Sequence, residues 1–202
     1  MLKVGIIGMG IRGNLYAETI KFNPFAEVTA FAEGSPERLE AAGARHQGTP
    51  YQDYRRMLEE NSFDIVIVAL PDHLHRDAVI AAASAGCNLL IEKPLATCYE
   101  DALAMAEAIR EAGVKALVGY ENRWSPVFIT AKEAVAAGEL QEIQLIQAKL
   151  NDSIFVPTKM LGWAAGSSVG WFLFPHTVDL ALWLSGKKAR TVQAIGQKNV
   201  LL

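Results

Sequence analysis

Cysteine is nearly absent from this chain: only Cys87 and Cys98 occur among 202 residues. Two cysteines supply neither a disulfide framework nor a cysteine-rich metal site, so we expect no metal and a reducing, cytoplasmic setting. Long apolar runs are missing too, because glycines interrupt the apolar start of the chain and no segment is long enough to span a bilayer. We therefore expect neither a signal peptide nor a membrane partner.

A strong excess of one charge is also missing, since the net charge is −3 at pH 7. This weak negative balance argues against nucleic acid or an anionic membrane surface as the main partner. Hydrophobic residues make up 51% of the chain and charged residues 20%, which is typical of a globular protein with a sizeable core. The length suits one large domain, or one domain and part of another.

Strand and helix signals alternate over residues 1–120. Unbroken apolar segments predict buried strands at 2–7, 28–32, 65–69, 89–91 and 116–118, with a short strand near Tyr51. Helical patterns with caps and stop signals lie between them, at 11–22, 36–42, 53–60, 72–85 and 97–112. Such alternation indicates a parallel sheet covered on both faces. We therefore predict an α/β fold whose N-terminal domain, residues 1–120, is a doubly wound Rossmann domain.

The rhythm changes after residue 120. Helices are predicted at 126–137 and 175–184, a loop at 158–171, and strands at 143–150 and 191–195. Residues 121–202 are therefore predicted to form a partial α/β domain with an open, largely antiparallel sheet. Because proteins normally cover an open sheet edge, we expect either further polypeptide or a partner subunit there, the latter giving a homodimer or homotetramer.

A glycine-rich turn joins the first strand to the first helix. Its sequence is Gly8-Met9-Gly10-Ile11-Arg12-Gly13. Glycines in this strand–turn–helix context let the backbone approach a pyrophosphate at the N-terminus of the helix. Arg12 either touches that pyrophosphate or points into solvent. Glu33 ends the second strand, where an acidic residue accepts hydrogen bonds from a ribose, unless it is simply a solvated glutamate. Because a carboxylate repels a 2′-phosphate, we expect NAD rather than NADP.

Two further side chains suit proton chemistry. Lys93 follows the strand at 89–91, and the carboxyl end of a parallel strand is where such folds hold ligands; the alternative is a surface lysine. His176 begins the helix predicted at 175–184, and a helix N-terminus favours the neutral imidazole of a general base. The alternative is a histidine that only caps its own helix.

Together these motifs resemble the Gfo/Idh/MocA oxidoreductases. In chain order the matching segments are the glycine turn, Leu70-Pro71-Asp72-His73-Leu74-His75, Glu92-Lys93-Pro94, Asn122-Arg123-Trp124-Ser125-Pro126, His176-Thr177-Val178-Asp179 and Trp183-Leu184-Ser185-Gly186. The resemblance covers nearly the whole chain. It implies hydride transfer between a nicotinamide cofactor and a hydroxyl of a sugar, cyclitol or nucleotide sugar.

The resemblance also implies roles for individual residues. Lys93 and His176 would be catalytic, and substrate contacts would come from Lys93, Arg123, His176 and Asp179. The cofactor would contact Gly8, Gly10, Ile11, Arg12, Gly13, Glu33, Leu70, Pro71, His75, Glu92 and Lys93. A purely structural His75 is the alternative to its role at the cofactor, and we interpret His46 and His73 as surface histidines.

Two features depart from the family pattern. The chain is shorter than family members, so its second sheet looks incomplete. Phe172 occupies the position, four residues before His176, where the family commonly has an aspartate that shares proton handling. Two alternatives to a dehydrogenase therefore stay open. One is an NAD-dependent glycosidase, and the other is a dinucleotide-binding or regulatory protein without catalysis.

Overall fold

The computed structural model describes residues 1–197 and divides into two compact units. The first unit, called here the Rossmann unit, comprises residues 1–120 and 151–175. The second comprises residues 121–150 and the chain from 176 onward. The last five residues of the predicted second domain, 198–202, lie outside the described part of the chain.

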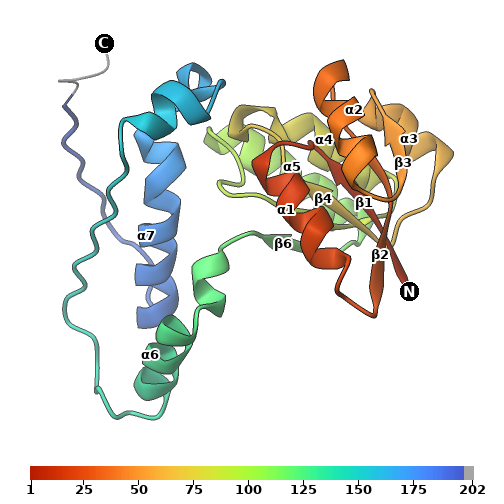
Figure 1. Cartoon of the computed structure of the whole chain (residues 1–202). Helices are drawn as coiled ribbons and strands as arrows, with labels where there is room; N and C mark the ends of the chain where they lie inside the picture. The colour runs from red at the N-terminus through yellow and green to blue at the C-terminus, as the bar shows by residue number, and fades with distance from the viewer. Residues whose placement is uncertain (198–202) are drawn as a thin grey trace. The chain divides into compact units, whose positions relative to one another are not determined.

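A six-stranded sheet forms the centre of the Rossmann unit (Figure 1). All its strand pairs are parallel, and the strand order is β3-β2-β1-β4-β5-β6. The strands are β1 (Leu2–Ile7), β2 (Ala26–Ala32), β3 (Thr49–Tyr51), β4 (Ile65–Val68), β5 (Asn88–Ile91) and β6 (Ala116–Val118). The predicted parallel sheet of a Rossmann fold is confirmed.

Helices cover both faces of this sheet. They are α1 (Ile11–Ile20), α2 (Pro36–Arg45), α3 (Tyr54–Glu60), α4 (His75–Ser84) and α5 (Tyr99–Ala112), with a 3-10 turn at Asp72–Leu74. Side chains alternate across each strand, so Val66 and Val68 of β4 pack with α3, α4 and α5 in one core cluster. Ile67 points to the opposite face and packs with α1 and α2 in the other cluster.

The turn from β1 into α1 depends on two glycines. Gly8 has φ +95°, and a Cβ there would lie 2.7 Å from the carbonyl oxygen of Ala69. A Cβ on Gly13 would lie well inside van der Waals contact with the carbonyl oxygen of Gly8. Only glycine at both positions lets α1 begin directly against the end of β1.

The prediction of strands at 143–150 and 191–195 was wrong. Neither segment is a strand in the structure, and the second unit has no sheet in its described residues. Both segments have a partly alternating apolar pattern, but a strand also needs a partner for its backbone hydrogen bonds. No partner is present in residues 121–197, so the predicted open sheet is not confirmed. The homo-oligomer that we expected from its open edge stays a prediction.

The helix predicted at 175–184 is longer at its N-terminal end. Helix α7 (Val169–Ser185) begins six residues earlier, so Pro175 lies inside it and His176 does not stand at a helix N-terminus. Proline is common in a first turn, which favoured the later start, but a helix interior tolerates it where one backbone hydrogen bond is lost. The predicted loop 158–171 also contains helical turns at Val156–Met160 and Ala164–Gly166.

The second unit is helical where it has regular structure. It contains a 3-10 turn at Glu121–Trp124, helix α6 (Pro126–Ala136) and the part of α7 after Pro175. Within the described residues, no helix combines the length and apolar character needed to cross a membrane. The same part of the chain contains no group of three or more side chains arranged to hold a metal ion.

We predict that Gly13→Ala lowers the free energy of unfolding by about 1–3 kcal/mol, because the added methyl group overpacks the β1–α1 turn. Gly43→Ala is the matched control. Gly43 lies in α2 with no atom within 4 Å of an added Cβ, so alanine there should stabilise the protein by about 0.5–1 kcal/mol. Denaturant unfolding checks both values. A neutral Gly13→Ala would contradict the crowding described here.

Candidate active site

The carboxyl ends of the strands gather the predicted cofactor residues at one edge of the sheet. β1 pairs with β2 on one side and with β4 on the other, so the strand order reverses direction at β1. In doubly wound sheets, ligands bind in the crevice at this switch point. The glycine turn follows β1, Glu33 follows β2, Leu70 follows β4, and Lys93 follows β5.

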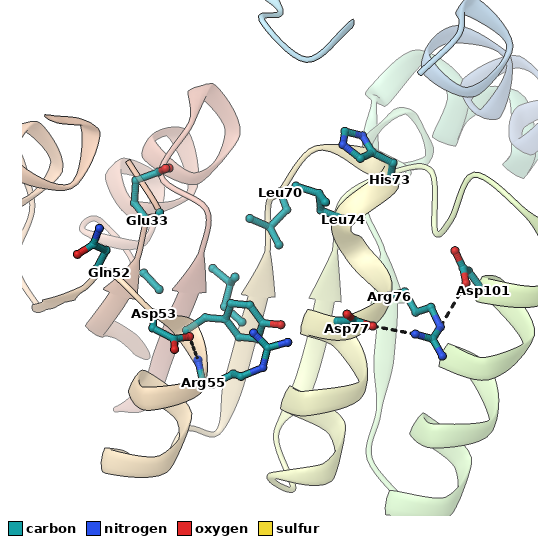
Figure 2. Close-up of a pocket in the computed structure, with 14 residues that line it drawn as sticks. Glu33, Gln52, Asp53, Arg55, Leu70, His73, Leu74, Arg76, Asp77 and Asp101 are labelled. Atoms are coloured by element: carbon teal, nitrogen blue, oxygen red, sulfur yellow. Dashed lines mark hydrogen bonds and ion pairs between the residues drawn. The ribbon is translucent and has the colours of Figure 1, made fainter. Parts of the chain in front are cut away.

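A cavity of about 710 Å³ opens at this edge (Figure 2). Its wall includes the ends of β1 and β2 and the start of the turn after β4. Figure 2 shows Leu70 in the middle of this wall, with ionisable side chains on either flank. The acidic side chains that line it are Glu33, Asp53, Asp77 and Asp101, and the basic ones are Arg55, Arg76 and His73. Carboxylates thus outnumber the permanently charged guanidinium groups.

Arg76 is neutralised within this wall. Its Nη1 donates to Asp77 at 2.8 Å, and its Nε lies 3.2 Å from Asp101 (Figure 2). One guanidinium group therefore faces two carboxylates. The cavity presents little net positive charge to an extra phosphate.

Glu33 is buried and accepts three hydrogen bonds. One carboxylate oxygen accepts hydrogen bonds from the Ser35 backbone at 3.0 Å and from the Arg38 guanidinium at 2.7 Å. The other accepts from the Met9 backbone at 3.0 Å, which ties the end of β2 to the glycine turn. Burial opposes ionisation of this carboxyl, but the hydrogen bonds from Arg38 and the two backbone groups outweigh it and lower the pKa of Glu33. Glu33 is therefore an anion, and the solvated-glutamate interpretation does not hold.

The Arg12 side chain is neither simply exposed to solvent nor free to turn toward a pyrophosphate, because neighbouring side chains bind it. Its Nε donates to Glu92 at 2.6 Å, and the Tyr16 hydroxyl donates to the same carboxylate oxygen at 2.6 Å. Burial, followed by the nearby Glu92 carboxylate, raises the pKa of Tyr16, so its hydroxyl keeps its proton. The other oxygen of Glu92 accepts from the Lys93 backbone at 3.2 Å. This cluster joins α1 to the strand end that carries Lys93.

Lys93 contacts the residue that departs from the family pattern. Its Nζ donates to the Phe172 carbonyl oxygen at 3.0 Å and lies 4.1 Å from the centre of the Phe172 ring. Both groups belong to the Rossmann unit. A carbonyl dipole and an aromatic face both attract an ammonium group. The carbonyl and the ring of Phe172 thus hold Lys93 at the position where the family commonly has an aspartate.

A second contact ties the segment 151–175 to the turn after β4. The Ser167 hydroxyl donates to the buried carboxylate of Asp72. Farther along the segment, the rings of Trp163 and Phe172 meet edge to face, with centroids 6.2 Å apart. The aromatic contact orients the ring that lies against Lys93.

His75 is buried, with an exposed fraction of 1%. Its Nδ1 lies 3.0 Å from the carbonyl oxygen of Pro94, and its Nε2 lies 3.0 Å from that of Leu70. With both ring nitrogens on backbone carbonyls, His75 bridges the turns after β4 and β5. This geometry favours the structural alternative over direct contact with a cofactor.

The remaining predicted cofactor residues frame the same edge. Gly10 is the N-cap of α1 and contributes no side chain, and Ile11 begins the helix with its side chain exposed. Pro71 follows Leu70 in the turn after β4. The first backbone N–H groups of a helix have no intrahelical acceptor, so the start of α1 offers donors to an anion.

The predicted substrate residues after position 120 belong to the second unit. The Arg123 guanidinium binds the buried carboxylate of Asp179 through two hydrogen bonds, one of them 2.8 Å from Nε to Oδ2. Nδ1 of His176 lies 3.5 Å from the Asn122 amide nitrogen and 4.0 Å from a Glu121 carboxylate oxygen. The residues from both predicted motifs of this unit therefore meet in pairs.

The Rossmann unit fits a dinucleotide. The glycine turn admits no Cβ at Gly8 or Gly13, the start of α1 offers backbone donors, and Glu33 is an anion beside the cavity. A pyrophosphate needs the turn and the donors, and a ribose needs the acceptor. When bound there, the dinucleotide would be held by the glycine turn, Glu33 and the turn after β4.

Two side chains of this edge were missed in the sequence. Asn14 donates to the Met9 and Gly10 carbonyls at 2.7 and 2.8 Å, and His46 contacts Asn14 at 2.7 Å. We interpreted His46 as a surface histidine; it is half-buried, and its ring also contacts Asn14. The one signal for Asn14 was its position a helical turn after Gly10; nothing in the sequence placed His46, 32 residues away, beside it.

Comparison with known proteins supports a dinucleotide site at this edge of the sheet. A model described as an oxidoreductase family with an NAD-binding Rossmann fold matches residues 2–120, and the model of the Gfo/Idh/MocA C-terminal domain matches residues 128–201. Levoglucosan dehydrogenase of Pseudarthrobacter phenanthrenivorans is 30% identical over 92% of this chain and 52% of its own length. The NAD⁺-dependent scyllo-inositol 2-dehydrogenase of Bacillus subtilis is 27% identical over 97% of this chain and 57% of its own.

Solved structures give the same result for the fold. Scyllo-inositol dehydrogenase from Lactobacillus casei, with bound NAD(H) and scyllo-inositol, has a TM-score of 0.84 at 23% identity and covers 93% of this chain and 57% of its own. The WlbA dehydrogenase of Bordetella pertussis, in complex with NADH and UDP-GlcNAcA, has a TM-score of 0.67 at 31% identity over 70% and 43% of the two chains. The chain thus spans about half the length of these relatives. It belongs to the Gfo/Idh/MocA oxidoreductase family, and residues 2–120 form that family's NAD-binding Rossmann fold.

Proposed function

We propose that this chain provides the cofactor-binding and proton-handling residues of an NAD-dependent dehydrogenase that oxidises a secondary hydroxyl of a sugar, cyclitol or nucleotide sugar. The observation that carries the proposal is the position of Lys93. Its ammonium group lies at the carboxyl end of β5 and is held by Phe172 within the unit that binds the dinucleotide. A fixed cation at that edge suits an alcohol whose oxygen becomes negative during oxidation.

Lys93 would act on the oxygen of the reacting hydroxyl. Its ammonium group is held at the Phe172 carbonyl oxygen. We propose that it donates a hydrogen bond to the substrate oxygen, and such a bond strengthens as negative charge builds on that oxygen. Bound NAD supplies the hydride acceptor. The chain contributes orientation and charge stabilisation at the substrate oxygen.

His176 would accept the hydroxyl proton. His176 belongs to the second unit, whereas Lys93 belongs to the Rossmann unit. The assignment therefore relies on the chemistry of imidazole and on the family motif. Asn122 and Glu121 lie near its Nδ1. Arg123 and Asp179 would contact the substrate as an ion pair.

The names of the relatives support the proposed substrate class. Their printed names include levoglucosan, scyllo-inositol and myo-inositol dehydrogenases, and one neighbour was solved with UDP-GlcNAcA. These compounds share ring carbons that bear secondary hydroxyls. We propose the same class for this chain, with the individual substrate to be found by screening.

A second candidate function has one observation in its favour. Phe172 contributes no ionisable group where the family commonly has an aspartate, so proton transfer has one fewer participant. A chain that binds the dinucleotide without turnover would keep the glycine turn, Glu33 and the cavity, and would need neither Lys93 nor His176 for chemistry. Turnover of any polyol excludes this candidate.

We predict that Lys93→Met abolishes NADH formation while the Kd for NAD changes by less than about threefold, because the ammonium acts mainly on the charge that develops during reaction. NADH absorbance and calorimetry measure the two quantities. Lys115→Met, at an exposed lysine of the same unit, is the control and should stay fully active. Wild-type turnover by Lys93→Met would show that the site is wrongly assigned.

Phe172→Asp should raise activity or shift its pH profile, because a carboxylate next to the Lys93 ammonium restores a third proton-handling group. Phe172→Leu is the matched control, since it keeps the backbone carbonyl and removes the ring without adding charge. The pH dependence of kcat/KM is the measurement. If the wild type is fully active and Phe172→Asp only loses stability, Phe172 is a packing residue and two groups suffice.

Glu33 should make NAD bind more tightly than NADP, because its carboxylate and the acidic cavity wall repel a 2′-phosphate. Glu33→Gln removes the charge and leaves Arg38 without its anionic partner, so the preference should fall at least tenfold. Adding Arg38→Ala to Glu33→Gln should weaken NADP again. Calorimetric Kd values test this, and tighter NADP binding by the wild type is the contrary result.

A further inference from the structure

The glycine turn is fastened by side chains that no cofactor motif includes. The Asn14 side chain donates from its amide nitrogen to two carbonyl oxygens of the turn, those of Met9 at 2.7 Å and Gly10 at 2.8 Å. On the other side, the Met9 N–H donates to Glu33. The peptide groups on both sides of Gly10 are therefore fixed by hydrogen bonds that their carbonyl oxygens accept.

Fixing these carbonyls also aims the N–H groups. A peptide unit is planar, and its C=O and N–H point in opposite directions. The Met9 carbonyl shares a peptide unit with the Gly10 N–H, and the Gly10 carbonyl shares one with the Ile11 N–H. The Gly10 carbonyl oxygen also accepts the Asn14 backbone N–H at 3.1 Å, so the Asn14 side chain matters most for the Met9 carbonyl. Holding both carbonyls on Asn14 turns the Gly10 and Ile11 N–H groups away from it. They belong to the start of α1, where backbone donors receive an anion.

His46 in turn fixes Asn14. Because the Asn14 amide nitrogen donates to the carbonyls, its oxygen faces His46, whose Nε2 lies 2.7 Å away. An amide oxygen only accepts, so Nε2 carries the proton in this contact. His46 is half-buried at the C-cap of α2, and its backbone N–H donates to the carbonyl oxygen of Ala42 at 2.9 Å. The end of α2 therefore holds the first turn of α1 through one side chain.

We propose that Asn14 and His46 are positioning residues for the pyrophosphate of the dinucleotide. His46 orients the Asn14 amide, and Asn14 orients the two peptide groups whose N–H groups meet the phosphates. The proposal extends the binding of NAD by this fold and concerns affinity for the diphosphate alone. Adenosine has no phosphate, so its binding should not depend on either residue.

The test compares the Kd of NAD with that of adenosine by calorimetry. We expect Asn14→Ala to weaken NAD about tenfold and His46→Ala about three- to tenfold, the range that lost hydrogen bonds of about 1 kcal/mol produce. Adenosine should change by less than about twofold in both variants. His46→Gln, which keeps an N–H donor, should retain most of the NAD affinity. In steady state, KM for NAD should rise with kcat unchanged.

Controls separate this inference from the rest of the account. Gln47→Ala, at an exposed neighbour of His46, should leave both Kd values unchanged. Alanine has a higher helix propensity than asparagine, so we expect Asn14→Ala to fold. This variant therefore tests the proposal even if His46→Ala does not fold. Unchanged NAD affinity in Asn14→Ala, or a parallel loss of adenosine affinity, would overturn the proposal. A wild type that binds no NAD would instead contradict NAD binding by this chain.

Discussion

The close approach of Gly13 to the carbonyl of Gly8 is the constraint on which this architecture depends. It lets α1 begin directly at the end of β1, and it therefore sets the donors at the helix start against the edge where β2, β4 and β5 also end. Glu33 then reaches the Met9 N–H, and Glu92 reaches Arg12 and Tyr16 of the same helix. A Cβ at position 13 would clash with the Gly8 carbonyl oxygen, so α1 could not keep this close approach to the end of β1.

The second theme is the contact between Lys93 and Phe172. The Lys93 backbone is tied to Glu92, while its ammonium group lies against the ring and carbonyl of Phe172. Both contacts belong to one compact unit, so the cation is oriented by the same body that presents the glycine turn. An aromatic face positions a cation without offering a proton acceptor.

The sequence predicted the parallel sheet well, because buried strands, glycine turns and helix caps are local patterns. Gly8, Gly13, Glu33 and Lys93 follow strand ends, and strand ends meet at one edge in any doubly wound sheet. What failed required distant partners. The apolar pattern of 143–150 and 191–195 does not make a sheet without a neighbouring strand, Pro175 did not reveal that α7 begins at Val169, and the pairing of His46 with Asn14 depends on how α2 packs beside α1.

The most direct test of the account is transfer of a labelled hydride. Cyclitols and sugars that carry deuterium on their hydroxyl-bearing carbons would be incubated with the protein and NAD, and C4 of the recovered NADH would be examined by NMR. The account predicts deuterium on one face of C4 from at least one such polyol. Tight binding of NAD without deuterium transfer from any cyclitol, sugar or nucleotide sugar would contradict it, and would leave a dinucleotide-binding protein without dehydrogenase activity.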